Sequence, residues 1–173
     1  NPPADETYPF SPGDIYQVTK FEAEELAWKY HREHGLPVAV VRPAAIFGPE
    51  DQRLLKMFRL ANRDRILLLG DGKIFYHMVH VEDLATGFLL AGTVPAAIGE
   101  VFIIAGDRYL SLNELVQRIA SILGKKGKLL HLPAAPVQWL GTFCEKTMIP
   151  LGLTPPIYRR RVDFFTKSRA FDI

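Results

Sequence analysis

The sequence of 173 residues contains one cysteine, Cys144, and no long run of apolar residues. A single thiol excludes a disulfide within the chain and favours a reducing compartment. No stretch reaches the roughly 18 consecutive apolar residues of a membrane-spanning helix, and the amino end lacks the basic and apolar parts of a signal peptide. These absences predict a cytoplasmic protein with no membrane partner.

The sequence also has no large excess of positive or negative charge, because it contains 21 lysines and arginines and 19 acidic residues. The concentrated basic tract is Arg159–Arg161, whose simplest interpretation is a solvated helix face. Nucleic-acid binding is therefore not predicted. Hydrophobic residues make up 48% of the chain, which is enough for one sizeable core and indicates an ordinary globular protein.

A glycine-rich phosphate-binding loop does not occur among the 13 glycines. Such a loop joins the first strand and helix of a dinucleotide-binding fold and holds the pyrophosphate. The chain also begins without methionine, in a stretch rich in proline. We therefore expect a carboxy-terminal piece of a longer protein, with the pyrophosphate site outside this sequence.

Tyr16 and Lys20 are the most informative residues that are present. Their spacing of four places them one turn apart on one face of a predicted helix over 14–34, where the ammonium can stabilise the phenolate. A phenol stabilised in this way can act as a general acid and base near neutral pH. The spacing alone is common in helices, so its context decides what it means.

Four further segments follow the pair: Arg42–Pro49, Phe75–Ala85, Glu100–Gly106 and Ser111–Leu115. In order and spacing, the pair and these segments resemble the extended short-chain dehydrogenase/reductase family, also called the NAD-dependent epimerase/dehydratase family. The resemblance covers nearly the whole chain.

The resemblance implies an α/β fold made of the carboxy-terminal half of a Rossmann-like, doubly wound parallel sheet and a small α/β substrate lobe. Residues 1–105 would belong to the Rossmann-like part, with interleaved substrate-lobe segments, and residues 106–173 mainly to the substrate lobe. The sequence pattern predicts buried strands over 38–41 and 101–105, short strands over 66–69 and 79–81, and an edge strand over 129–132. It predicts helices over 14–34, 54–61, 82–90, 111–123 and 137–149. Asp71 and Gly72 have the composition of a hairpin turn.

The predicted helix 14–34 has two apolar sides. One stripe contains Tyr16, Lys20, Ala23, Ala27 and Tyr30, and a cluster on roughly the opposite side contains Val18, Phe21 and Trp28. We expect the first stripe to lie on the sheet, while the second cluster can meet a second subunit or be covered by its own chain. The resemblance implies a homodimer through this helix.

By resemblance, Tyr16 is the catalytic acid/base, and it exchanges a proton with a substrate hydroxyl or carbonyl while hydride moves to or from a nicotinamide. Lys20 holds the phenolate and hydrogen-bonds the nicotinamide ribose, so both residues also bind the cofactor, NAD or NADP. Pro43, Ala44 and Ile46 match the family segment that passes the nicotinamide. Arg42 has a structural alternative, since an arginine at a strand end often anchors a neighbouring carboxylate or carbonyl.

The predicted substrate is a small molecule with a secondary alcohol or ketone, in particular a sugar or nucleotide sugar. Nucleotide-sugar members commonly carry an arginine where this chain has Tyr76 and His77, which makes these two residues candidates for substrate contact. A hydroxysteroid- or dihydroflavonol-type reductase and a non-catalytic cofactor sensor or scaffold are the alternatives. The family's upstream serine or threonine has no counterpart here, so the piece alone is expected to be nearly inactive.

A metal site is not predicted. His31 and His34 are three residues apart on the predicted helix, a spacing that metal sites use, but no third ligand accompanies them.

Overall fold

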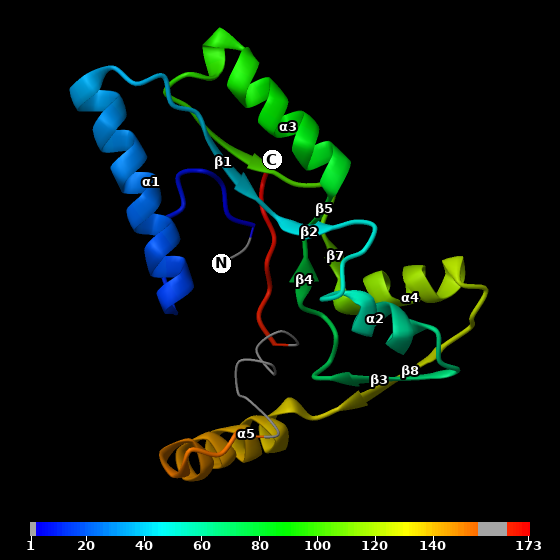
Figure 1. Cartoon of the computed structure of the whole chain (residues 1–173). Helices are drawn as coiled ribbons and strands as arrows, with labels where there is room; N and C mark the ends of the chain where they lie inside the picture. The colour runs from blue at the N-terminus through cyan, green and yellow to red at the C-terminus, as the bar shows by residue number, and fades with distance from the viewer. Residues whose placement is uncertain (1–2, 156–165) are drawn as a thin grey trace. The chain divides into compact units, whose positions relative to one another are not determined.

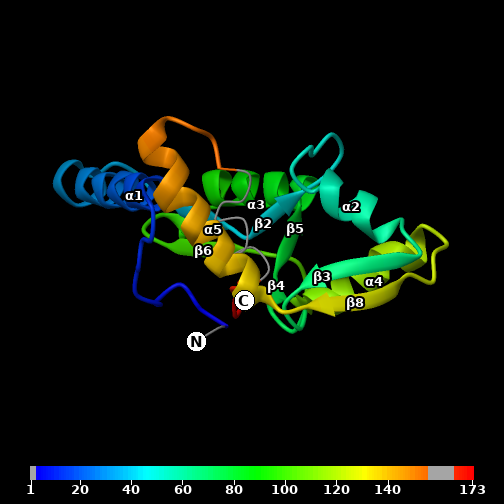
Figure 2. The same ribbon diagram turned by 90° about the horizontal axis from the view of Figure 1, so that it is seen from below.

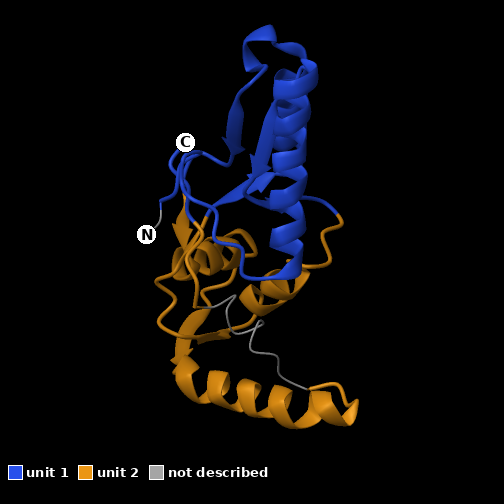
Figure 3. Cartoon of the chain, turned by 90° about the vertical axis from the view of Figure 1, so that its left-hand side faces the viewer, with its two compact units in different colours: residues 1–49, 77–108, 170–173 blue, residues 50–76, 109–169 orange. Residues whose placement is uncertain are grey.

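The computed structural model describes residues 3–155 and 166–173 and shows an α/β protein (Figure 1). The chain divides into two compact units (Figure 3). The first unit comprises residues 1–49, 77–108 and 170–173, and the second comprises residues 50–76 and 109–169. The basic tract Arg159–Arg161 lies outside the described residues.

The first unit is built on parallel strand pairs. β1 (Val40–Pro43) pairs with β6 (Val101–Ile104), and β2 (Ala45–Phe47) pairs with β5 (Met78–His80). Its helices are α1 (Ile15–His34), α3 (Val81–Thr93) and the 3-10 turn η1 (Pro95–Ala97). Parallel pairing needs long crossover connections. Residues 48–77 connect β2 to β5, and α3 lies in the connection between β1 and β6. The predicted parallel α/β architecture is therefore confirmed.

The core of the first unit is small and centres on Ala44, Val79 and Leu84, with side chains such as Ile46 and Phe171 packed against it. β1 begins two residues later than predicted, and its residues are half-buried or exposed rather than buried on both faces. α3 contacts β1 and runs beside it (Figure 1).

α1 turns a different side to its unit than the sequence pattern predicts. Val18, Phe21 and Trp28 are half-buried, whereas Ala23 is exposed and Tyr30 is 48% exposed. The rings of Phe21 and Phe10 lie 4.7 Å apart between centroids. Burial of a large aromatic side chain stabilises the fold more than burial of an alanine does. The side of α1 that carries Phe21 and Trp28 therefore packs against the rest of its unit. The prediction was wrong for these side chains, although Ala27 of the predicted inner stripe is half-buried.

The second unit contains the parallel pair β3 (Arg65–Leu69) and β8 (Lys128–Leu132) and the short antiparallel pair β4 (Phe75–Tyr76) and β7 (Leu110–Ser111). Its helices are α2 (Leu55–Ala61), α4 (Leu112–Ile122), α5 (Ala134–Met148) and the 3-10 turn η2 (Ile149–Leu151). Figure 2 shows β3 and β8 side by side, with α2 and α4 near them. The apolar core consists of Met57, Ala61, Ile66, Leu68, Leu112, Val116, Ile119 and Ala120.

The first turn of α4 carries the predicted capping box. The hydroxyl of Ser111 accepts a hydrogen bond from the Glu114 amide at 3.2 Å, and the Glu114 carboxylate accepts one from the Ser111 amide at 2.8 Å. This reciprocal pair satisfies amide groups that a helix start leaves without backbone partners. The start of α4 is therefore fixed locally, as its sequence predicts.

The hairpin predicted at Asp71 and Gly72 was wrong. β3 pairs with the distant β8 and not with the strand that follows the turn. The turn is held by Asn113 instead, whose amide donates to the Gly72 carbonyl at 3.0 Å and whose side chain donates to the Asp71 carbonyl at 2.9 Å. Gly72 has φ 68°, a left-handed backbone conformation that glycine adopts readily. This conformation belongs to the turn that Asn113 holds.

Gly106 lies where the end of β6 meets β5, and it tolerates no side chain there. A Cβ at this position would lie 2.8 Å from the backbone carbonyl oxygen of Met78, which the Gly106 amide already contacts. We expect Gly106→Ala to lower the free energy of unfolding by about 1–2 kcal/mol, measured by urea unfolding. Gly92→Ala is the control, because nothing lies within 4 Å of its Cβ position, and it should not destabilise the protein.

Candidate active site

The amino end of α1 positions the predicted catalytic tyrosine. Asp14 caps the helix, and its carboxylate accepts a hydrogen bond from the Gln17 amide at 2.9 Å. The Gln17 side chain accepts one from the Gly13 amide at 2.8 Å. An aspartate at the cap satisfies a free amide and fixes the first turn, in which Tyr16 lies.

Tyr16 and Lys20 stand one turn apart, as their spacing predicts. The Lys20 ammonium nitrogen lies 5.8 Å from the centroid of the Tyr16 ring, within the range of a cation–π interaction. Tyr16 is 62% exposed, so its hydroxyl is open to approach from solvent. The structure therefore brings the two side chains together, and their catalytic role remains a prediction.

A pocket of about 620 Å³ lies beside this pair. Its volume is that of a small-molecule site. Its lining combines an apolar majority with a hydroxyl-bearing and charged minority: Phe10, Ser11, Pro12, Tyr16, Gln17, Lys20, Phe21, Glu24, Val40, Val41, Arg42, Pro43 and Phe88. The sequence analysis did not identify Phe10, Glu24 or Phe88 as part of the site.

Arg42 holds together the segments that line this pocket. Its guanidinium forms two hydrogen bonds with the Glu24 carboxylate, at 2.6 and 3.1 Å, and one with the backbone carbonyl of Glu6 at 2.8 Å. Its terminal carbon lies 4.5 Å from the centroid of the Phe10 ring. The arginine therefore joins α1, β1 and the amino-terminal segment, which confirms the structural role considered for it.

The segment predicted to pass the nicotinamide is only partly on the pocket. Pro43 lines it, whereas Ala44 is 7% exposed and belongs to the core, with Ile46 packed against it. The Ala44 amide donates to the Ile104 carbonyl at 2.9 Å. Contact of Ala44 and Ile46 with a cofactor remains a prediction.

Tyr76 and His77, the predicted substrate contacts, are buried, with 4% and 1% of their surface exposed. His77 uses both ring nitrogens: Nε2 donates to the Gly106 carbonyl at 2.7 Å, and Nδ1 accepts from the Phe171 amide at 3.4 Å. The His77 and Phe171 rings stack. These contacts give His77 a structural use, and the substrate role of both residues remains a prediction.

Burial raises the pKa of Tyr76 from 10.0 to about 12, and the nearby Arg169 opposes this in part. Below pH 10 the phenol is protonated in both the folded and the unfolded chain. Between pH 10 and 12 only the unfolded chain releases the proton, so stability falls as the pH rises, by roughly 2 kcal/mol. Urea unfolding should show this loss for the wild type. The stability difference between wild type and Tyr76→Phe should be constant below pH 9 and should shift in favour of the variant above pH 10.

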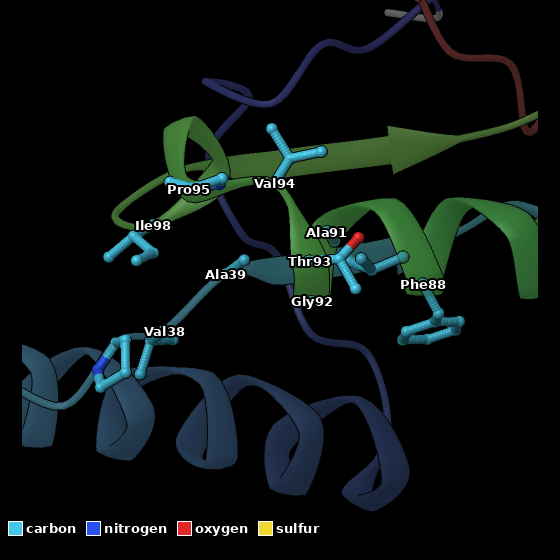
Figure 4. A pocket seen from close by; sticks show the side chains of 11 residues that line it. Val38, Ala39, Phe88, Ala91, Gly92, Thr93, Val94, Pro95 and Ile98 are labelled. Atoms are coloured by element: carbon cyan, nitrogen blue, oxygen red, sulfur yellow. The ribbon is translucent and has the colours of Figure 1, made fainter.

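A second pocket, of about 610 Å³, is walled by β1, α3 and η1 (Figure 4). Its labelled side chains are apolar apart from Thr93, whose hydroxyl donates to the Leu89 carbonyl at 2.7 Å. It holds no titratable side chain. Of these two pockets, only the one lined by Tyr16 has side chains that could carry out acid–base chemistry.

Metal ligation finds no support within residues 3–155 and 166–173, where no group of three or more His, Cys, Asp or Glu side chains could hold an ion. His31 has a partner of another kind, because its Nδ1 lies 2.6 Å from the Leu36 carbonyl. Within the same described ranges, no helix is long and apolar enough to cross a membrane.

Parallel α/β architecture is what this chain shares with the Rossmann-fold epimerases and dehydratases of solved structure. The family described as the NAD dependent epimerase/dehydratase family matches residues 1–105, and the chain belongs to that family. The family is NAD-dependent, which confirms the predicted type of cofactor.

The relatives include a hydroxysteroid dehydrogenase and a nucleotide-sugar epimerase. The chain is 30% identical, over an alignment of 185 positions, to the 3beta-hydroxysteroid-dehydrogenase/decarboxylase isoform 1 of Arabidopsis thaliana, and the match covers 98% of the chain and 42% of the relative. It is 29% identical to the UDP-glucuronate 4-epimerase of Thermodesulfobacterium geofontis, over 72% of the chain and 38% of the relative.

A solved structure shows the same fold with a cofactor. The dTDP-glucose 4,6-dehydratase of Bacillus anthracis, solved in complex with NAD, is 27% identical, has a TM-score of 0.62, and matches 74% of the chain and 42% of its own length. The chain thus spans less than half the length of each of these three relatives.

Proposed function

We propose that the whole protein is an NAD(P)-dependent oxidoreductase or epimerase that acts on a secondary alcohol or ketone of a sugar or nucleotide sugar. The observation that carries this proposal is the placement of Tyr16 and Lys20 together on the wall of one pocket. Relatives named as a UDP-glucuronate epimerase and a dTDP-glucose dehydratase support a sugar substrate.

In this proposal Tyr16 moves the proton at the substrate oxygen. When the alcohol is oxidised, its O–H proton passes to the Tyr16 phenolate. The hydrogen on the carbon that bears the hydroxyl leaves as hydride. NAD(P), when bound, supplies the acceptor for that hydride and its donor in the reverse direction. The ammonium of Lys20 stabilises the phenolate and has three donors with which to bind ribose hydroxyls.

The residues present suit the nicotinamide end of the cofactor. Lys20 offers donors for a ribose, Pro43 and Phe88 offer apolar surface for a ring, and the pocket is large enough for one such group. A dinucleotide also needs a pyrophosphate site, and the loop that would provide it is not part of this sequence. These residues would therefore hold only one end of NAD(P).

A hydroxysteroid dehydrogenase is the second candidate. The match to the Arabidopsis 3beta-hydroxysteroid-dehydrogenase/decarboxylase covers 98% of the chain, whereas the match to the UDP-glucuronate epimerase covers 72%. The chain also has Tyr76 and His77 where nucleotide-sugar members commonly carry an arginine for the diphosphate. Both observations favour a less charged substrate than a nucleotide sugar.

The experiment that tests the proposal measures binding of NAD(H) and NADP(H) to the whole protein and turnover on a panel of nucleotide sugars and 3β-hydroxysteroids. Interconversion of sugar epimers without net NAD(P)H formation supports the epimerase, and NAD(P)H formed from a hydroxysteroid supports the second candidate. Cofactor binding with no turnover on any member of the panel would contradict both and favour a cofactor sensor.

A further inference from the structure

Lys20 lies between two side chains of α1 that can interact with its charge. Tyr16 is one turn before it and Glu24 is one turn after it, so both stand on its side of the helix. All three residues line the pocket of the candidate active site. The Lys20 ammonium lies 5.8 Å from the centroid of the Tyr16 ring. Within residues 3–155 and 166–173 it forms no salt bridge, although a carboxylate is one turn away.

A second lysine and glutamate of α1 show that this spacing permits an ion pair. Lys29 and Glu33 have the same order and the same spacing of four, and the Lys29 ammonium lies 4.0 Å from the Glu33 carboxylate. Glu24 differs because its two carboxylate oxygens accept hydrogen bonds from Arg42, at 2.6 and 3.1 Å. A guanidinium that binds both oxygens forms a stronger and better defined pair than an ammonium does. Arg42 therefore holds the carboxylate that Lys20 could otherwise bind.

We propose that Arg42 is a positioning residue for the acid/base pair. By holding the Glu24 carboxylate, it keeps the Lys20 ammonium available to the Tyr16 phenol. Lys20, Glu24 and Arg42 are the charged side chains among the described residues that line the pocket. The carboxylate of Asp14, two residues before Tyr16, accepts a hydrogen bond from a backbone amide of the first turn of α1. The inference rests on the proposed function, in which Lys20 stabilises the Tyr16 phenolate.

Burial explains why Glu24 competes for Lys20 once Arg42 is removed. The Glu24 side chain is 12% exposed, so little water is available to stabilise its charge, and the carboxylate needs a cationic partner. Lys20 is one turn away on the same pocket wall. An ion pair with Glu24 would offset the positive charge with which Lys20 stabilises a phenolate. Loss of Arg42 therefore acts on Tyr16 through Lys20, in addition to its effect on folding.

The kinetic test compares variants of the whole protein that break the same ion pair with and without leaving its carboxylate. Arg42→Met leaves the Glu24 carboxylate beside Lys20, and we expect kcat to fall about tenfold. Arg42→Met combined with Glu24→Met removes that carboxylate and should recover most of the loss. Turnover is measured well below the melting temperature of each variant, with folding checked by circular dichroism. A double variant that turns over no faster than Arg42→Met would overturn the proposal, since a purely structural ion pair predicts that result.

The pH profile of turnover separates a change at the acid/base pair from a general loss of activity. In the direction of alcohol oxidation, the rise of kcat with pH should move to higher pH in Arg42→Met, because the phenolate forms less readily without a free ammonium beside it. The profile should return towards that of the wild type in the double variant. Arg42→Gln, which keeps a side-chain donor, replaces Arg42→Met in both comparisons if Arg42→Met does not fold. Unchanged profiles in all variants would overturn the proposal.

A crystal structure of the Arg42 variant tests the competition itself and does not require turnover. We expect the Lys20 ammonium within about 4 Å of the Glu24 carboxylate and turned away from the Tyr16 ring. A Lys20 that stays beside Tyr16 in this variant would overturn the inference. If the wild type binds NAD(P) but turns over no substrate, the proposed function fails, and the position of Lys20 still shows whether Arg42 keeps Glu24 from it.

Discussion

Tyr16→Phe should lower turnover by the whole protein by about 10²–10³-fold and leave binding of NAD(P) nearly unchanged. The substitution removes the hydroxyl that would exchange a proton with the substrate oxygen. It keeps the ring, which is 62% exposed and contributes little to folding. The measurement is kcat on the responding substrate, with cofactor affinity determined separately by titration.

Variants on the same helix separate catalysis from structure. Lys20→Met should lower turnover and also weaken cofactor binding, because one ammonium serves both the phenolate and the ribose. Tyr30→Phe is the matched control, since Tyr30 is 48% exposed on the same helix and does not line the pocket. If Tyr16→Phe keeps more than about a tenth of wild-type turnover, Tyr16 is not the acid/base and another group must move the proton.

Local features of the fold could be predicted because neighbouring residues determine them. The capping box at Ser111 and Glu114 closes within one turn, so its composition is sufficient to place the start of α4. The same holds for Tyr16 and Lys20, whose spacing on a helix brings them together whatever surrounds them.

Features that depend on distant partners could not be predicted. The turn at Gly72 has the composition of a hairpin, but its conformation is used to dock Asn113. The two-residue strands β4 and β7 are too short to carry an alternating pattern. The inner side of α1 depends on Phe10, a residue of the irregular segment before the helix, whose contact with Phe21 no local pattern reveals.

The same limit applies to the site. Arg42 was recognised as a residue that would anchor a carboxylate or carbonyl, but its partners could not be named. Glu24 lies 18 residues away on a helix, where its spacing from neighbouring charges suggests only a solvated face. Only the fold shows that its carboxylate is turned inward and completes the wall of the pocket.

Arg42→Met should lower the free energy of unfolding by roughly 2–4 kcal/mol. The side chains of Arg42 and Glu24 are 23% and 12% exposed, so the variant leaves a largely buried carboxylate without its two charged hydrogen bonds. It also removes the donor to the Glu6 carbonyl and the cation above the Phe10 ring. The measurement is urea unfolding at pH 7 and low salt.

The controls separate the partly buried ion pair from the general effect of losing a cation. Lys29→Met removes an ammonium that is 60% exposed and lies 4.0 Å from the carboxylate of Glu33, whose side chain is 54% exposed, and such an exposed pair should cost less than about 1 kcal/mol. Arg42→Met combined with Glu24→Met should be less destabilised than the sum of the two single variants, because the second change removes the carboxylate that the first leaves unpaired. Additive losses would show that Arg42 stabilises the pocket wall through its packing on Phe10, and not through its bond to Glu24.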